Sequence, residues 1–170
     1  MMGEVVFRRA LEGDAGSIME IIDFARQKML AEGKQQWDEG YPLRSDIDAD
    51  ISGGDAYVLC IGGRVVAYGV IIFGEEPAYR HIVNGKWLSD QPYVVVHRLA
   101  VSGRERRRGL GRLFMQRVEQ MMAERGVHSF KVDTNFDNEA MLHMLDKLSF
   151  SYCGEINYER GTRMAFEKVL

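Results

Sequence analysis

The chain has 170 residues, of which 46% are hydrophobic and 28% are charged, and its net charge is −3. A chain of this length is expected to form one domain and to bury roughly 70% of its unfolded surface, so it needs neither a disulfide nor a structural metal. The composition excludes a collagen-like or disordered chain. The longest apolar run, residues 65–73, is far shorter than the ~20 residues of a membrane span, and the first twenty residues lack the apolar core of a signal peptide. We therefore expect a cytoplasmic protein without a membrane segment.

The cysteines and the charge distribution narrow the possible partners. Cys60 and Cys153 are the two cysteines and form no CxxC pair, so a cysteine-based zinc site is excluded and we expect no bound metal. Residues 103–112 hold five arginines against one glutamate, whereas residues 32–55 hold seven acidic residues against two basic ones. The first run can attract a compact anion and the second a cation, although charge runs are equally often solvated surface. The net negative charge, with no aromatic residue at 104–112, argues against a nucleic-acid partner.

The first half of the chain predicts one strand, two helices and a hairpin. Residues 5–9 form a short strand, and residues 14–33 carry apolar side chains at helical spacing between a capping aspartate and a terminating glycine. Residues 34–43 form a loop, and residues 44–51 a short helix. Residues 57–61 and 65–73 are strands joined by Gly62-Gly63, which indicates a hairpin. Residues 74–92 are polar and aromatic and are broken by prolines and glycines, so we expect them to leave the sheet.

The second half predicts alternating strands and helices. Residues 93–101 form the strongest strand, and residues 109–125 a helix that ends at Gly126. A strand at 127–133, a helix at 138–148 and a closing hairpin of residues 152–159 and 162–169 follow. The expected element order is therefore β-α-α-β-β-β-α-β-α-β-β.

Residues 94–114 (VVVHRLAVSGRERRRGLGRLF) carry the clearest chemical signal. A strand runs into a loop of glycines and arginines that opens directly into a helix. The first turn of a helix leaves about four backbone N–H groups without intrahelical partners, and these favour an anion. Gly109 and Gly111 let an anion approach the backbone closely. Charge-assisted donors come from Arg106, Arg107, Arg108 and Arg112. We therefore expect a pyrophosphate to bind here.

Two common phosphate loops do not fit this segment. The nucleoside-triphosphate pattern GxxxxGK[ST] is absent, and the dinucleotide pattern GxGxxG fails because Phe114 stands where the third glycine belongs. The pattern that remains is [RQ]xxGx[GA] at residues 106–111, directly after a strand. A second segment, residues 138–150 (NEAMLHMLDKLSF), begins with an asparagine that opens a helix and ends with Ser149-Phe150.

On these two segments and the element order, the whole chain resembles the GNAT-type N-acetyltransferases. The resemblance implies a single α/β domain spanning residues 1–170, with one mixed, mainly antiparallel sheet of about seven strands and helices on both faces. It also implies acetyl-CoA as co-substrate. The backbone of Leu99, Ala100 and Val101 would hold the pantetheine arm, with Asn138 and Met141 on the next helix. Residues 106–112, including Leu110, would wrap the pyrophosphate, and the strand carrying Leu99 would splay from the strand that starts at Val127.

The chain departs from the family pattern at two positions. Ser149 replaces the usual glycine, which alters the turn. Leu145 stands where many members carry a tyrosine that protonates the departing thiolate, so this acid is missing or is supplied from elsewhere. Tyr152 is our candidate for it, with Tyr158 and His143 as further donors; a thiolate with a pKa near 8.5 also leaves without a dedicated acid.

His97 is the candidate general base. An alkyl amine with a pKa near 10.4 is mostly protonated at pH 7, and only its neutral form attacks, so a base would help by roughly 10²–10⁴-fold. Strand alternation places His97 and Leu99 on one face, and some family members have a histidine base at this position. A hydrogen-bonded structural histidine is the alternative. An acetyl-cysteine route through Cys60 or Cys153 is disfavoured because neither thiol has an activating partner in the sequence, so we expect direct transfer in a ternary complex.

The acceptor is expected to be a primary amine of a small molecule or peptide. Candidate substrate-binding residues are aromatic side chains on the loops: Trp37, Tyr41, Tyr79 and Trp87. Equally, the two tryptophans can be core residues that fix long loops. A non-catalytic CoA-binding sensor and an acyltransferase with another acyl donor or an alcohol acceptor stay open as alternatives. The oligomeric state is also open, with a homodimer through the late strands as one arrangement.

Overall fold

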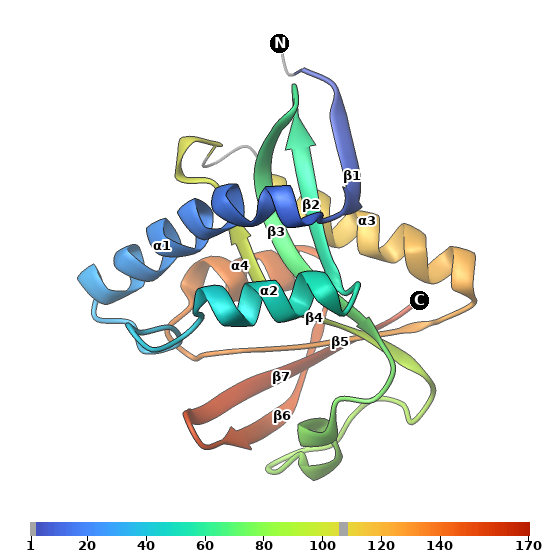
Figure 1. Ribbon diagram of the computed structural model, residues 1–170. Helices are drawn as coiled ribbons and strands as arrows, with labels where there is room; N and C mark the ends of the chain where they lie inside the picture. The colour runs from blue at the N-terminus through green and yellow to red at the C-terminus, as the bar shows by residue number, and fades with distance from the viewer. Residues whose placement is uncertain (1–2, 106–108) are drawn as a thin grey trace. The chain divides into compact units, whose positions relative to one another are not determined.

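The structure is a computed structural model that describes residues 3–105 and 109–170. In chain order its elements are β1 (Val5–Arg9), α1 (Ala15–Ala31), α2 (Arg44–Ser52), β2 (Ala56–Ile61), β3 (Arg64–Phe73), β4 (Tyr93–Val101), α3 (Leu110–Arg125), β5 (Ser129–Thr134), α4 (Glu139–Lys147), β6 (Ser151–Tyr158) and β7 (Gly161–Val169) (Figure 1). Short 3-10 helices lie at Glu12–Asp14, Pro77–His81 and Gly103–Glu105. Apart from these short helices, the order is the one predicted.

The seven strands form one sheet in the order β1-β2-β3-β4-β5-β7-β6. The pairs β1/β2, β2/β3, β5/β7 and β6/β7 are antiparallel, and β4 pairs with β5 in parallel. The predicted α/β fold with a mixed, mainly antiparallel sheet is confirmed.

The chain divides into two compact units. The first comprises Met1–Ile71 and His97–Val118, and the second Ile72–Val96 and Glu119–Leu170. The boundary falls within β4, whose first four residues belong to the second unit and whose last five belong to the first.

Helices cover both faces of the strands in the first unit. Tyr68 and Gly69 are neighbours on β3 and therefore face opposite sides of the sheet. The Tyr68 hydroxyl donates to Asp50 of α2 at 2.7 Å, whereas a Cβ built on Gly69 would lie 2.6 Å from the Phe114 ring of α3. Phe114 also meets Phe7 of β1 edge to face, with 5.4 Å between ring centroids. The prediction of helices on both faces is confirmed for this unit.

In the second unit, the predicted excursion at residues 74–92 packs closely against β6. A Cβ built on Gly85 would lie 2.0 Å from the carbonyl oxygen of Cys153, and one on Gly154 would lie 2.7 Å from that of Val83. Val83 and Glu155 exchange backbone hydrogen bonds of 2.9 and 2.8 Å. The two backbones therefore approach so closely that Gly85 and Gly154 leave no room for a side chain.

A buried carboxylate holds the same excursion on the sheet. Glu167 of β7 is fully buried and accepts hydrogen bonds from the backbone N–H groups of Leu88 and Ser89 and from the hydroxyls of Ser89 and Ser129. A buried charge without hydrogen bonds is costly. Glu167 can therefore be buried only while residues 88–89 stay in place to donate their hydrogen bonds.

Candidate active site

The predicted pyrophosphate loop is anchored where it leaves β4. A Cβ built on Gly103 would lie 2.5 Å from Cζ of Phe24 on α1, so this position accepts only glycine while Phe24 keeps its place. Glu105 is 4% exposed and forms an ion pair of 2.8 Å with Arg64 of β3. Residues 103–105 are therefore fixed from two sides before the loop continues.

The residue directly before α3 has the geometry expected of an anion-binding turn. Gly109 has a φ of +69°, which favours glycine, and apart from its chain neighbours no heavy atom of the described residues lies within 4 Å of a Cβ built there. Leu110 is 2% exposed and directs its side chain inward, while Arg112 is exposed. The described part of this turn fits a phosphate group, since a space that a side chain would fill lies beside the start of a helix. The candidate residues Arg106, Arg107 and Arg108 lie outside the described residues.

The C-terminal half of β4 contains a backbone irregularity. Arg98 has a φ of +53°, a left-handed conformation that costs a non-glycine residue of order 1 kcal/mol. It stands between His97 and Leu99, so regular strand alternation does not relate these two side chains as the sequence suggested. Leu99 and Val101 are half-buried and Ala100 is buried.

A hydrogen-bonded cluster surrounds Arg98. Its Nη1 lies 3.1 Å from both carboxylate oxygens of Asp50 on α2, and its guanidinium lies 5.3 Å from the centre of the Tyr41 ring. Asp50 also accepts a hydrogen bond from Tyr68 of β3. Among the described residues Arg98 Nε is buried without a hydrogen-bond partner, and the Tyr41 ring offsets part of that cost. Arg98 is thus held by Asp50 of α2 and by Tyr41 of the preceding loop, and Tyr68 of β3 in turn holds Asp50.

Burial sets the protonation of this cluster. It raises the pKa of the Asp50 carboxyl from its ordinary value, against the Tyr68 hydrogen bond and the Arg98 charge, which lower it. It also raises the pKa of the Tyr68 and Tyr41 hydroxyls. Both phenols therefore stay neutral at physiological pH, and the Tyr68 hydroxyl donates a hydrogen bond to the Asp50 carboxylate.

His97, the candidate base, is half-buried and lies close enough to Asp50 for the two side chains to interact electrostatically. The role of His97 stays a prediction. Asp50 was not among the predicted site residues, because an aspartate on a short, acidic helix looks like ordinary surface in the sequence.

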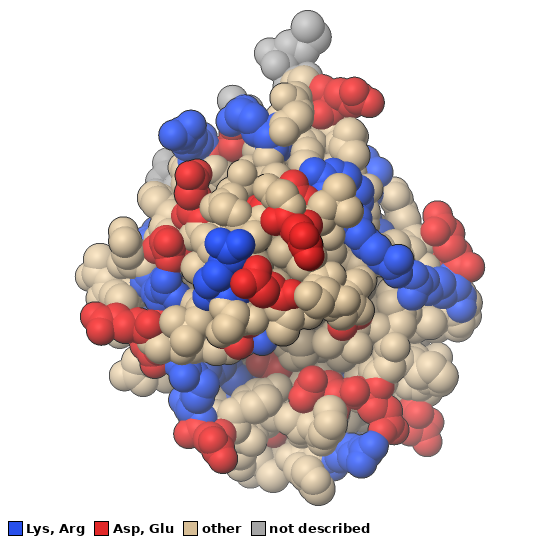
Figure 2. All heavy atoms as spheres, viewed as in Figure 1, with Lys and Arg blue, Asp and Glu red and all other residues tan. Residues whose placement is uncertain are grey.

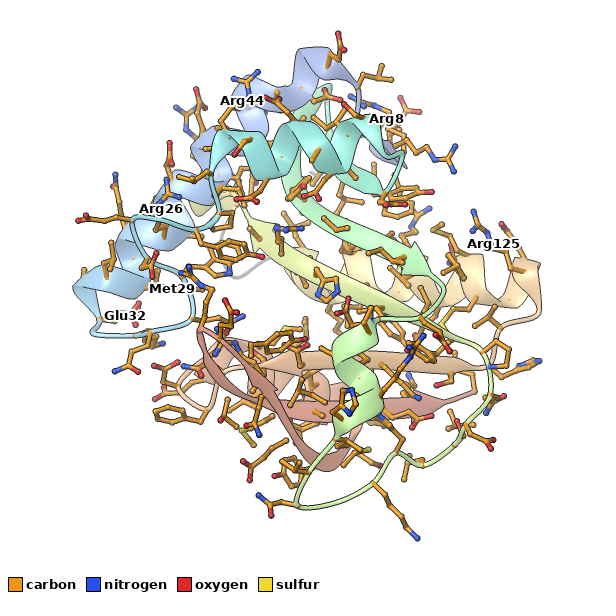
Figure 3. All side chains as sticks on the ribbon, turned by 60° about the horizontal axis from the view of Figure 1, so that its bottom comes forward. Arg8, Arg26, Met29, Glu32, Arg44 and Arg125 are labelled. Carbon is orange, nitrogen blue, oxygen red and sulfur yellow. The ribbon has the colours of Figure 1, made fainter. Side chains whose placement is uncertain are left out.

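The loop between α1 and α2 holds two candidate acceptor residues. Trp37 is 4% exposed, so it is part of the core, while Tyr41 is half-buried against Arg98. Arg26, which Figure 3 labels on α1, donates hydrogen bonds to the carbonyl of Pro42 and to Asp23. The hydrogen bond from Arg26 therefore holds the loop on α1. The burial of Trp37 agrees with the alternative in which this residue is a core side chain that fixes the loop. The substrate role of both aromatic residues stays a prediction.

The acidic run at residues 32–55 is partly neutralised by ion pairs. Asp48 pairs with Arg44, Glu32 with Lys34, and Asp50 with Arg98. On the face that carries α1 and α2, acidic and basic side chains lie next to one another (Figure 2). The run is therefore not a continuous negative surface.

Both departures from the family pattern lie in or just after α4. Asn138 is its N-cap and accepts a hydrogen bond from the backbone N–H of Met141 at 3.2 Å. Leu145 is fully buried, so this position offers no proton donor. Ser149 has a φ of +68°, the conformation that glycine adopts most readily. The expected change in the turn is therefore not seen: the serine keeps the left-handed conformation that suits glycine, at a cost in backbone strain.

The remaining candidates lie in the second unit. Tyr79 is 3% exposed, and its hydroxyl donates a hydrogen bond of 2.7 Å to Asp133. Trp87 Nε1 donates a hydrogen bond of 2.8 Å to the backbone carbonyl of Tyr79. Tyr152, the candidate acid, is 51% exposed and packs edge to face on Phe166. The structure brings Tyr79 and Trp87 together, with 5.0 Å between ring centroids, and the roles of all three stay predictions.

Cysteine chemistry finds no support. Burial raises the pKa of Cys60 and of Cys153, which disfavours the reactive thiolate, and both thiols are buried. Within residues 3–105 and 109–170, no group of three or more histidine, cysteine, aspartate or glutamate side chains is arranged to hold a metal ion. In the same part of the chain no helix has the length and hydrophobicity to cross a bilayer.

Comparison with known proteins identifies the family. A search of curated proteins finds no match. Among solved structures, a GNAT-family acetyltransferase from Streptococcus agalactiae is 35% identical, with a TM-score of 0.89 over 100% of this chain and 98% of that one. A GNAT-family acetyltransferase from Listeria monocytogenes (20% identity, TM-score 0.76, coverage 99% and 96%) and a ribosomal-protein-alanine N-acetyltransferase from Brucella melitensis (18%, 0.69, 97% and 99%) share the fold. Residues 20–150 match the sequence model of the Acetyltransferase (GNAT) family, and the chain belongs to that family.

Proposed function

We propose that this acetyltransferase moves the acetyl group of acetyl-CoA to a primary amine of a small molecule or peptide, by direct attack within a ternary complex. The observation that carries the proposal is the turn at Gly109: an exposed, left-handed glycine directly before α3, beside which a Cβ would meet no described atom. In a member of this family, such a turn fits the pyrophosphate of CoA.

Three groups of residues would bind the parts of CoA. The backbone of Leu99, Ala100 and Val101 would hold the pantetheine arm. Gly109, Leu110, Gly111 and Arg112 would hold the pyrophosphate, with Arg106, Arg107 and Arg108 as further donors. Asn138 and Met141 would contact the arm from α4. Acetyl-CoA supplies the acetyl group as a thioester.

Transfer forms one N–C bond and breaks one C–S bond. The acceptor's ammonium group loses one proton before the neutral amine attacks, and the nitrogen loses a second proton as the amide forms. His97 would accept the first of these protons, directly or through water, as a general base. The departing sulfur takes up a proton, which Tyr152 or solvent would supply, since the buried Leu145 supplies none. The buried cysteines, with their raised pKa values, favour direct transfer over an acetyl-cysteine step.

The test combines binding and turnover. CoA and acetyl-CoA should each raise the melting temperature, because a ligand at 100 times its dissociation constant adds ~2.7 kcal/mol of stability. Release of free thiol from acetyl-CoA is then followed with alkyl amines, amino acids and peptides as acceptors. Acceptor-dependent thiol release supports the proposal. CoA binding without turnover would favour the sensor alternative, and the absence of any CoA binding would overturn both.

A further inference from the structure

We propose that Asp133, in the second unit, binds the ammonium group of a small aliphatic amine. The proposal starts from the position of Asp133 near the C-terminal end of β5. All six residues of β5 are described; five are buried, and Asp133 is half-buried. The side chain of Asp133 is therefore the place at which solvent or a ligand reaches this strand.

One carboxylate oxygen of Asp133 is held by two tyrosines. Oδ2 accepts a hydrogen bond from the hydroxyl of Tyr79 at 2.7 Å and from that of Tyr158 at 2.8 Å. Burial raises the pKa of both hydroxyls, so both remain protonated donors at neutral pH. The carboxylate is thus oriented by two neutral groups from two different segments.

Among the residues that the structure describes, the second oxygen of Asp133 has no such partner. Within the described part of the chain, Oδ1 accepts no hydrogen bond and Asp133 forms no ion pair. Oδ1 is also not among the buried unpartnered atoms, so solvent reaches it. Asp133 therefore offers one fixed, accessible carboxylate oxygen.

The nearby cations are engaged elsewhere. Lys131, two residues earlier on the same face of β5, places Nζ 4.5 Å from the centre of the Trp87 ring and 4.1 Å from that of Tyr93. Arg163 of β7 donates to Asn135 at 3.3 Å. Neither side chain forms an ion pair with Asp133, so its negative charge is left for a ligand.

An alkylammonium ion matches these features. It donates charge-assisted hydrogen bonds to a carboxylate oxygen, and these are stronger than hydrogen bonds between neutral groups. A metal ion fits less well, because no group of three potential ligand side chains occurs among the described residues. The aromatic residues then have a defined part: Tyr79 and Tyr158 position the carboxylate, and Trp87 supports Tyr79 through the hydrogen bond to its carbonyl.

The test uses butane-1,4-diamine as the cationic probe and butane-1,4-diol as its uncharged counterpart of similar length. Binding of each is measured by calorimetry on protein saturated with CoA, which cannot donate an acetyl group. Asp133→Asn keeps an oxygen acceptor for both tyrosines and removes the charge, so it should weaken diamine binding at least tenfold while the dissociation constant of CoA changes less than twofold. The diol should bind to neither protein.

Asp146→Asn is the matched control, since it removes a negative charge from an exposed position on α4 and should leave diamine binding unchanged. If Asp133→Asn does not fold, Asp133→Glu keeps the charge but moves it, and should weaken diamine binding at least threefold. Wild-type protein that does not bind the diamine, or an Asp133 variant with wild-type affinity, overturns the assignment. Loss of CoA binding in the wild-type protein would instead overturn the proposed function, so the two failures are distinguishable.

Discussion

Arg98 and Asp50 are joined through a single nitrogen: Nη1 of the arginine lies 3.1 Å from each carboxylate oxygen, and the side chains are 18% and 12% exposed. The pair ties β4 to α2 at the residue whose φ is +53°.

Asp50→Ala should destabilise the protein strongly. It leaves a largely buried guanidinium without its carboxylate and removes the acceptor of the Tyr68 hydroxyl, so we expect a loss of about 3 kcal/mol in unfolding free energy. At this chain length that is a fall of about 6–12 °C in melting temperature. Urea unfolding measures it. Asp48→Ala is the control on the same helix: its ion pair with Arg44 is exposed and should contribute less than about 0.5 kcal/mol. Equal losses of unfolding free energy in the two variants would show that the buried pair stabilises the protein no more than the exposed one.

The acid limb of the stability curve should depend on Asp14. A hydrogen bond from Arg8 lowers the pKa of the Asp14 carboxyl in the folded protein. The unfolded chain therefore binds this proton more readily, so the contribution to stability is complete above the unfolded pKa and is lost as the pH falls through the folded pKa. Asp14→Asn should lower the melting temperature at pH 6, and the difference from wild type should shrink toward pH 2.5. A difference that stays constant over this range would contradict the linkage.

Gly109→Val should weaken CoA binding at least tenfold, because its side chain would occupy the open space beside the start of α3. Gly126→Val is a close control. Gly126 has a φ of +67°, against +69° for Gly109, and a Cβ built there also meets no described atom within 4 Å. Both variants carry the same backbone strain at opposite ends of one helix, so their stabilities should fall alike while only Gly109→Val loses CoA affinity. Equal CoA affinities would show that the cofactor lies elsewhere.

His97→Ala should lower kcat/KM by roughly 10²–10⁴-fold near pH 7 if His97 accepts the proton of the amine. The deficit should narrow as the pH rises toward the amine's own pKa near 10.4, since more of the acceptor is then neutral without help. The pH–rate profile with an alkyl amine is the measurement. His128→Ala, at an exposed position, should leave the profile unchanged. A deficit that is the same at every pH would assign His97 a structural part.

Local patterns in the sequence were sufficient to predict most of the helices and strands. The strand predicted at residues 93–101 has the bounds of β4, because a long apolar, β-branched run leaves few alternatives. The 3-10 helix at Pro77–His81 was not predicted, since five residues give too little periodicity to read. The left-handed Arg98 was also missed, because nothing in its neighbours marks a break in alternation.

The candidate site was predicted only where it is local in sequence. The start of α3 was predicted to within one residue, with Gly109 as the first helical residue instead of Leu110, since a glycine before an apolar period is a local signal. The Asp133 arrangement joins residues 54 and 25 positions apart, and Arg98 meets Asp50 across 48 positions. Such contacts depend on which strands become neighbours, which hydrophobic periodicity alone does not specify. Glu167 was missed for a related reason: a fully buried charge is rare, and its four donors come from two distant segments.

The hydrogen bonds of Glu167 limit how this protein can be engineered. Two of the residues that satisfy it, Leu88 and Ser89, belong to the excursion rather than to the sheet. A shorter connection grafted in place of residues 74–92 would remove the hydrogen-bond donors of Leu88 and Ser89 from the Glu167 carboxylate, which water does not reach. A chimera of that kind should tolerate the exchange only if position 167 is changed to an apolar residue at the same time, so connection and strand must be swapped as one module.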